Sequence, residues 1–186
     1  MKVIPLFNNQ QQLIKKLLQN DRSAQKELFT LFAPKMMGVC RQYIKDLQFA
    51  EEVMLNGFLK AMTHLKSFEN KGSFEGWIRR IMINECISFL RQQKPQLLID
   101  DNRYFEDKTE HQEQEAFEIS DLQQLVDNLP NDFKLVFNLF AIEGLSHKDI
   151  SNTLKISEQA SRLRLFKART QLKEEYSRLK NATNGK

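Results

Sequence analysis

Residues 72–95 read GSFEGWIRRIMINECISFLRQQKP, and their pattern of apolar side chains indicates how this part of the chain folds. On a helical wheel with about 100° per residue, two of its sides are apolar, so a helix here is expected to lie mostly buried among other helices. The one polar stripe that remains consists of Trp77, Arg80, Asn84, Ser88 and Arg91. A buried helix that keeps an indole, two guanidinium groups, an amide and a hydroxyl on a single ridge indicates a binding surface.

Apolar residues at helical spacing continue through nearly the whole chain, and only six glycines and four prolines interrupt them. No stretch alternates convincingly in the way a strand does, so we expect an all-α fold. Two small helical domains on a tether are predicted, because the periodic pattern stops at Pro95 and resumes near Ile119. The expected helices are 10–19, 23–44, 48–67, 74–93, 119–128, 131–143, 147–154 and 158–180.

The composition, 41% hydrophobic and 28% charged, is that of a soluble globular protein. No apolar run approaches the ~18 residues of a membrane span. The first residues, MKVIPLFNNQQ, lack the apolar region and cleavage site of an export signal, so a cytoplasmic location is expected. Cys40 and Cys86 each lie in an apolar helical pattern, which favours reduced core residues over a disulfide or a metal pair.

Charge is distributed unevenly along the chain. Residues 1–95 carry 15 basic and 8 acidic side chains, residues 96–118 carry 2 and 8, and residues 119–186 carry 11 and 8. The middle segment is polar, acidic and without a clean apolar stripe, which predicts a linker or flexible tether. The chain thus has two basic blocks joined by an acidic segment, a distribution that its function has to explain.

The most specific local signal lies between Leu129 and Leu172, where a short helix, a tight turn and a longer helix are expected. Gly144 can end one helix, and Ser146 and Ser157 can cap the next two. The apolar residues expected to form a core stripe in this region are Leu139, Ile142, Leu145, Ile150 and Leu154. This is a helix-turn-helix pattern, in which the second helix enters the major groove of duplex DNA.

The wheel of residues 158–173 places Ser161, Leu165, Ala168 and Leu172 on its inward face. The side chains on its flanks suit DNA, since Gln pairs with adenine and Arg with guanine or phosphate. They are Gln159, Arg162, Arg164, Lys167 and Arg169. The alternative is a basic helix that is merely solvated.

The ridge on residues 72–95 suits a different form of nucleic acid. An exposed Trp offers a stacking face to an unpaired base, and arginines attract phosphates. The preceding ENKGS loop contains a glycine and can approach a flipped base closely. The alternative is that Trp77 packs in the core while the arginines are solvated.

These residues resemble a known family. LFTLFAPKMM, AEEV, FLKA and SFEGWIRRIMIN resemble, in order and spacing, the sigma-2 domain of extracytoplasmic-function (ECF) sigma factors. Residues 119–180, with their L-P, G-L-S and D-I-S elements and an arginine-rich helix, resemble the sigma-4 domain of the same family. The expected domains are sigma-2 at 8–95, an acidic linker at 96–118 and sigma-4 at 119–182.

The resemblance implies a subunit that joins core RNA polymerase and directs promoter-specific initiation. On this analogy the melted −10 element is faced by Asn70, Lys71, Gly72, Ser73, Trp77, Arg80, Asn84 and Arg91. The −35 duplex is faced by Lys148, Ser157, Gln159, Arg162, Arg164 and Lys167. The helix surface that docks on the polymerase is formed by Glu52, Leu55, Asn56 and Leu59.

The partners implied by the resemblance are promoter DNA and core RNA polymerase, through its β′ clamp helices and β flap. An anti-sigma factor, often membrane-anchored in this family, is a third. The chain departs from the family at the docking helix, where Leu55 and Asn56 replace the usual Gln and Glu. Ser88 replaces an Asp near the end of the −10 helix, and Ser161 replaces a Val of the recognition helix.

The remaining residues predict neither an enzyme nor a cofactor. His64, His111 and His147 have no ligand spacing with each other or with the cysteines, so no metal site is expected. A phosphate-binding glycine loop and a nucleophile elbow are both missing from the sequence. Two other function classes stay open, namely a stand-alone helix-turn-helix regulator that binds duplex operator DNA and a helical adaptor that binds only protein.

Overall fold

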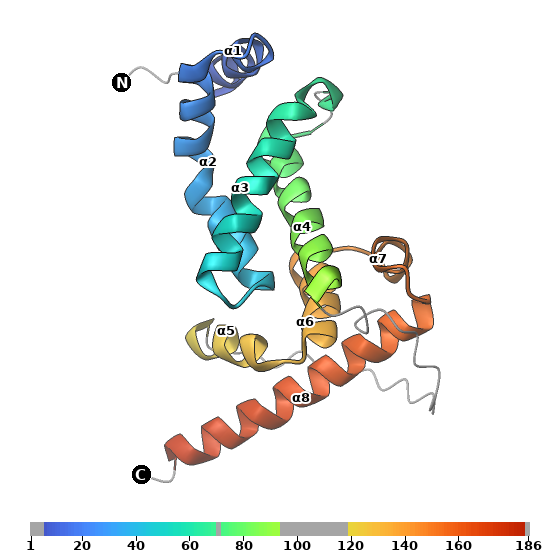
Figure 1. Cartoon of the computed structure of the whole chain (residues 1–186). Helices are drawn as coiled ribbons and strands as arrows, with labels where there is room; N and C mark the ends of the chain where they lie inside the picture. Colours follow the sequence, from blue (N-terminus) through green and yellow to red (C-terminus); the bar gives the residue numbers. More distant parts are fainter. Residues whose placement is uncertain (1–5, 70–71, 94–118, 185–186) are drawn as a thin grey trace. The chain divides into compact units, whose positions relative to one another are not determined.

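The computed structural model describes residues 6–69, 72–93 and 119–184, and within these ranges all regular secondary structure is helical (Figure 1). The chain divides into two compact units at Gln92. The first unit contains α1 (Leu6–Leu18), α2 (Arg22–Tyr43), α3 (Leu47–Thr63), the 3-10 turn η1 (Leu65–Ser67) and α4 (Phe74–Gln93). The second contains α5 (Ile119–Asn128), α6 (Asn131–Phe137), the π-helical turn η3 (Asn138–Ile142), α7 (His147–Leu154) and α8 (Glu158–Asn184).

The all-α prediction with two helical domains is confirmed, while the expected linker at 96–118 lies outside the described residues. Two helices begin where an aspartate can cap them. Asp21 accepts hydrogen bonds from the backbone N–H groups of Ser23 and Ala24 at the start of α2. Asp46 does the same for the start of α3. Such caps satisfy donors that have no partner within the helix.

The core of the first unit is centred on α4. Phe74, Ile78, Met82 and Cys86, each four residues after the last, have no solvent exposure. Gly57 of α3 lies against this face, and a Cβ added there would meet the Met82 side chain. The Met82 side chain therefore fills the space that a side chain at position 57 would take.

Both cysteines lie in this core, as the sequence predicts, and carry free thiols. Cys40 of α2 and Cys86 of α4 have no solvent exposure. A hydrogen bond with the Cys40 thiol, followed by burial, raises the pKa of Cys86 above its ordinary value. The Cys86 thiolate is therefore disfavoured.

The second unit has a separate apolar core. Its main cluster joins Leu125, Val126 and Leu129 of α5 to Ala168 and Leu172 of α8. The predicted core stripe holds at Leu139 of η3 and at Ile150 and Leu154 of α7, which are fully buried, whereas Leu145 is partly exposed. Ile142 departs from it with 44% exposure. The reason is η3, because a turn with i→i+5 hydrogen bonds shifts the helical register and rotates Ile142 outward.

The helix-turn-helix caps lie where the sequence predicts them. Gly144 adopts a φ of 67° and ends the preceding helix. Ser146 accepts a hydrogen bond from the Asp149 backbone N–H, and Ser157 accepts one from Ala160. Between α7 and α8, Lys155 adopts the left-handed conformation, with a φ of 58°. The turn between the two helices is thus fixed by local hydrogen bonds.

Candidate nucleic-acid and polymerase interfaces

Trp77 of α4 is held in place by aromatic neighbours. Its ring stacks on Phe74 with a centroid distance of 5.7 Å and an interplanar angle of 13°. Phe68 packs against it at 5.5 Å. The side chain remains partly exposed, as do Ser88 and Arg91 of the same ridge, while Arg80 and Asn84 are exposed. Trp77 therefore packs on the core and also reaches the surface.

A hollow of about 240 Å³ lies beside this ridge. It is lined by Lys60, His64, Ser67, Trp77, Ile81, Asn84 and Glu85. The hollow joins the end of α3, the turn η1 and one side of α4. Two predicted ridge residues, Trp77 and Asn84, form part of its wall. The sequence pattern does not identify the other five lining residues as part of a site.

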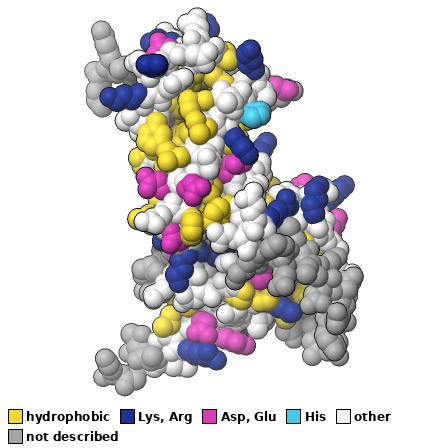
Figure 2. All heavy atoms as spheres, viewed as in Figure 1, with side chains coloured by type: hydrophobic (Ala, Val, Ile, Leu, Met, Phe, Trp, Pro, Cys, Tyr) yellow, Lys and Arg dark blue, Asp and Glu magenta, His cyan; other side chains and the backbone are white. Residues whose placement is uncertain are grey.

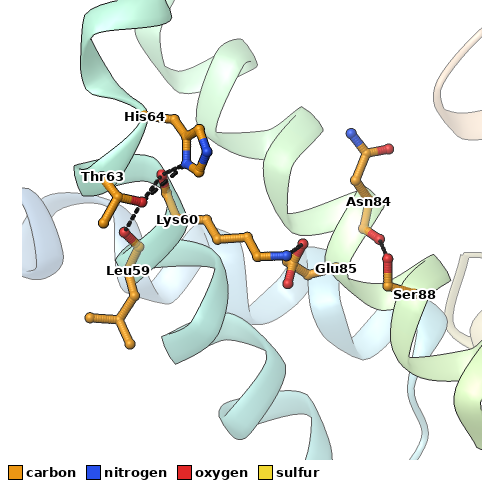
Figure 3. Close-up of polar contacts among 7 residues, drawn as sticks. All are labelled: Leu59, Lys60, Thr63, His64, Asn84, Glu85 and Ser88. Atoms are coloured by element: carbon orange, nitrogen blue, oxygen red, sulfur yellow. Dashed lines mark hydrogen bonds and ion pairs between the residues drawn. The ribbon is translucent and has the colours of Figure 1, made fainter.

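The polar groups of the hollow are held by an ion pair between two helices. Lys60 reaches from α3 to Glu85 on α4, with 2.7 Å between Nζ and Oε1 (Figure 3). The Glu85 side chain is only 14% exposed, whereas that of Lys60 is 54% exposed. Partial burial of the carboxylate makes its pairing with Lys60 more important than that of a surface ion pair.

His64 lies at the rim of the hollow in a defined orientation. Its Nδ1 is 3.0 Å from the carbonyl oxygen of Lys60 and 3.0 Å from the Thr63 hydroxyl (Figure 3). Because a carbonyl oxygen can only accept, Nδ1 is assigned as the donor. Ser88 donates to the backbone oxygen of Asn84 at 2.8 Å, a contact that does not use the Asn84 side-chain amide.

The predicted −10 loop is only partly described. Asn70 and Lys71 lie outside the described residues. Gly72 has a φ of 98°, a conformation that side chains other than glycine rarely adopt. The Ser73 hydroxyl accepts a hydrogen bond from the Gly76 N–H at 3.0 Å and so caps the first turn of α4. Gly72 and Ser73 therefore set the direction in which the loop enters the helix.

The predicted polymerase-docking residues share the outer face of α3. All four are exposed, including Leu55 at 45% and Leu59 at 58%. The members are Glu52, Leu55, Asn56 and Leu59. Figure 2 shows hydrophobic side chains gathered on the visible face of the first unit with acidic side chains beside them. Exposed leucines next to a carboxylate favour protein contact over solvent alone.

On the recognition helix α8, the structure exposes Gln159, Arg162 and Lys167, and on α7 it exposes Lys148. Arg162 lies 3.5 Å from the Glu158 carboxylate one turn earlier. Ser157 uses its hydroxyl as the α8 cap. These side chains belong to the N-terminal part of α8 and the start of α7, the part of a helix-turn-helix that meets DNA.

The expectation that Arg164 is exposed is wrong. It is only 9% exposed, and its Nε lies 3.8 Å from an Asp132 carboxylate oxygen of α6. It follows Ser161 by three positions and precedes Ala168 by four, and both of these are fully buried, so it belongs to the inward side of α8. Pairing with Asp132 offsets part of the cost of burying the guanidinium.

Other site types find no support in the part of the chain that the structure describes. There, no group of three or more His, Cys, Asp or Glu side chains is arranged to hold a metal ion. Among the same residues, no helix combines the length and apolarity needed to span a bilayer.

Comparison with known proteins gives two family matches in the order of the two units. Residues 28–96 match Sigma-70 region 2, and residues 119–172 match Sigma-70, region 4. The RNA polymerase sigma-H factor of Pseudomonas aeruginosa is 28% identical, with 86% of this chain and 89% of that protein covered. The ECF RNA polymerase sigma-E factor of Haemophilus influenzae is 27% identical, with 86% and 90% covered.

A solved structure with the same fold is that of the sigma factor RpoE from Bartonella quintana, which was crystallised with the anti-sigma factor NepR. The TM-score is 0.51 and the identity is 21%, over 80% of this chain and 94% of that one.

Proposed function

Because the chain belongs to the sigma-70 family, as an RNA polymerase sigma factor of the ECF group that directs transcription initiation, we propose that its two units bind two different states of promoter DNA. The domain at 8–95 captures the melted −10 element. The domain at 119–182 reads the −35 element as duplex, and residues 96–118 join the two. The protein acts in the cytoplasm as a specificity subunit without a reaction of its own.

The hollow beside Trp77 is the observation that carries the −10 assignment. Its volume of about 240 Å³ lies below the ~300–1,000 Å³ of typical small-molecule sites, a size that suits one planar base. Trp77 supplies an aromatic wall, and the Asn84 amide supplies both a donor and an acceptor. Arg80 and Arg91 attract the phosphates of the same strand. A base inside a duplex cannot reach such a hollow, whereas an unpaired one can.

The −35 assignment is supported by the exposed side chains at the start of α8. Gln159 and Arg162 are of the types that read adenine and guanine in the major groove. Lys148 and Lys167 are placed for phosphates. Arg164, being buried and paired with Asp132, is assigned to the stability of the unit and not to DNA.

The outer face of α3, with Leu55 and Leu59, is proposed to dock on the β′ clamp helices of the core polymerase, with the second unit against the β flap. An anti-sigma factor is a further proposed partner, in line with the complex in which RpoE of Bartonella quintana was crystallised. Truncation of both leucines to alanine tests the docking face, because it should lower affinity for core polymerase while leaving the unfolding free energy nearly unchanged.

The decisive experiment is reconstitution with purified core polymerase. Initiation on a pool of genomic promoters should require both proteins, and permanganate reactivity of thymines should report a melted −10 region. Gel shifts with duplex promoter should show only weak binding by the protein alone. Tight duplex binding without polymerase, together with no initiation after its addition, would instead identify a stand-alone helix-turn-helix regulator.

A further inference from the structure

His147, the first residue of α7, contacts the middle of the helix-turn-helix through a side-chain hydrogen bond. Its Nδ1 lies 2.9 Å from the hydroxyl oxygen of Ser161 on α8. Ser161 is fully buried, between the buried Ala160 and the apolar core residues Leu165 and Ala168 of the same helix. A buried hydroxyl in an apolar position needs a partner, and the His147 ring provides it.

The ring of His147 is also fixed by stacking. It lies on Phe140 with a centroid distance of 4.8 Å and an interplanar angle of 25°. The Arg169 guanidinium of α8 lies 5.5 Å from the centroid of the same Phe140 ring. The imidazole is thus tied to η3 through Phe140 and to α8 through Ser161, so a shift of α7 against α8 would disturb both contacts.

The charges around the ring favour its neutral form. Burial is the largest cause that lowers the pKa of His147 below the ordinary value of 6.5, and Arg162 and Arg169 lower it further. Glu158 acts in the opposite direction. All three charged groups belong to α8, and Phe140 presents only an uncharged face. An imidazolium between two arginines would be repelled from this position.

We propose that His147 is a positioning residue for −35 recognition, which holds the start of α8 at a fixed angle to α7 through the Ser161 hydroxyl. Arg162 directly follows Ser161, and Gln159 precedes it by two positions, so a tilt of this turn moves both candidate base-reading side chains. The inference rests on the proposed reading of the −35 duplex by this unit. It adds a residue that itself need not touch a base.

The test measures the −35 discrimination of the holoenzyme, meaning the ratio of initiation on a promoter with its own −35 element to initiation on one with that element scrambled. His147→Phe keeps an aromatic ring that can stack on Phe140 but removes the Nδ1 that contacts the Ser161 hydroxyl. The ratio should fall about tenfold, as expected when a buried hydroxyl loses its partner. Ser161→Val alone should cost less, because the partly exposed imidazole can bond to water.

The double variant His147→Phe/Ser161→Val supplies the control, since it replaces the polar pair by an apolar one. Its ratio should return to within about twofold of the wild-type value, because neither group is then left unpaired. A double variant no better than His147→Phe would overturn the proposal. So would a His147→Phe variant with the wild-type ratio.

A pH profile separates positioning from simple loss of folding. The wild-type ratio should decline as the pH is lowered below 6.5 and His147 becomes protonated, whereas the ratio of the double variant should not. Parallel decline of the two proteins would contradict the proposal. If the wild-type holoenzyme shows no preference for its own −35 element at any pH, the proposed function is overturned as well. If the His147→Phe holoenzyme keeps the full wild-type preference, only this inference is overturned.

Discussion

Trp77 packs on the core of the first unit and is also the residue proposed to stack on an unpaired base. Stacking on Phe74, which is fully buried, fixes the plane of the indole before any DNA arrives. A ring that is already oriented loses little conformational entropy when a base stacks on it. This arrangement explains why a large aromatic residue can stay partly exposed on the ridge without being left free to rotate.

Trp77→Ala should impair promoter opening more than closed-complex binding, because a base–aromatic stack is worth about 1–3 kcal/mol and forms only with an unpaired base. Permanganate reactivity gives the open fraction, and a gel shift on ice gives closed binding. Trp77→Phe is the matched control, which keeps an aromatic face and should retain most of the opening. Equal losses at the two steps in Trp77→Ala would point to a purely structural role.

Two arginines on α8 that look alike in sequence should behave differently. Arg162→Ala should weaken −35 recognition by about 1–3 kcal/mol with little change in stability, since its side chain is exposed. Arg164→Ala should instead lower the unfolding free energy by about 1–3 kcal/mol, because it leaves Asp132 without its partner. Promoter competition and urea unfolding measure the two effects. The assignment fails if Arg162→Ala retains its −35 preference.

At the scale of elements, the crossing of α3 and α4 at Gly57 sets the geometry of both candidate surfaces of the first unit. The outer face of α3 carries the docking leucines, and the hollow lies between the end of α3 and α4. The distance between these two helices should therefore affect both the proposed docking face and the hollow proposed to receive a base.

Gly57→Ala should destabilise the first unit by about 1–3 kcal/mol, since the added methyl group overlaps the end of the Met82 side chain, which is fully buried and has to take another rotamer within the core. Denaturant unfolding measures the loss. Gly38→Ala, at a helical glycine of α2 with no atom near its Cβ position, is the matched control and should not lower stability. Equal stability of the two variants would show that α3 and α4 adjust at no cost.

The helices and caps could be predicted from the sequence because their signals are local. Ser146, Ser157 and Gly144 lie next to the helix ends that they determine. The hollow could not be predicted, because it depends on contacts such as Lys60–Glu85, 25 residues apart and on different helices. Arg164 was misplaced because a wheel that treats every arginine as exposed ignores a carboxylate partner from another element.

At the scale of the whole molecule, the described residues form two units with separate apolar cores, and stability should therefore not be a single quantity. Scanning calorimetry of the full chain should resolve two transitions. Gly57→Ala should lower only the first unit's transition, and Arg164→Ala only the second unit's. One transition that both variants shift together would contradict this independence.

The buried thiols of Cys40 and Cys86 provide a built-in reporter of the first unit. They are the chain's two cysteines, both fully buried, and the raised pKa of Cys86 keeps its thiol protonated. Alkylation by iodoacetamide therefore requires opening of the helices around them, and the alkylation rate reports how often that opening occurs. Mass spectrometry of the alkylated chain can measure how far bound polymerase or DNA lowers the alkylation rate, with no dye or engineered tag attached.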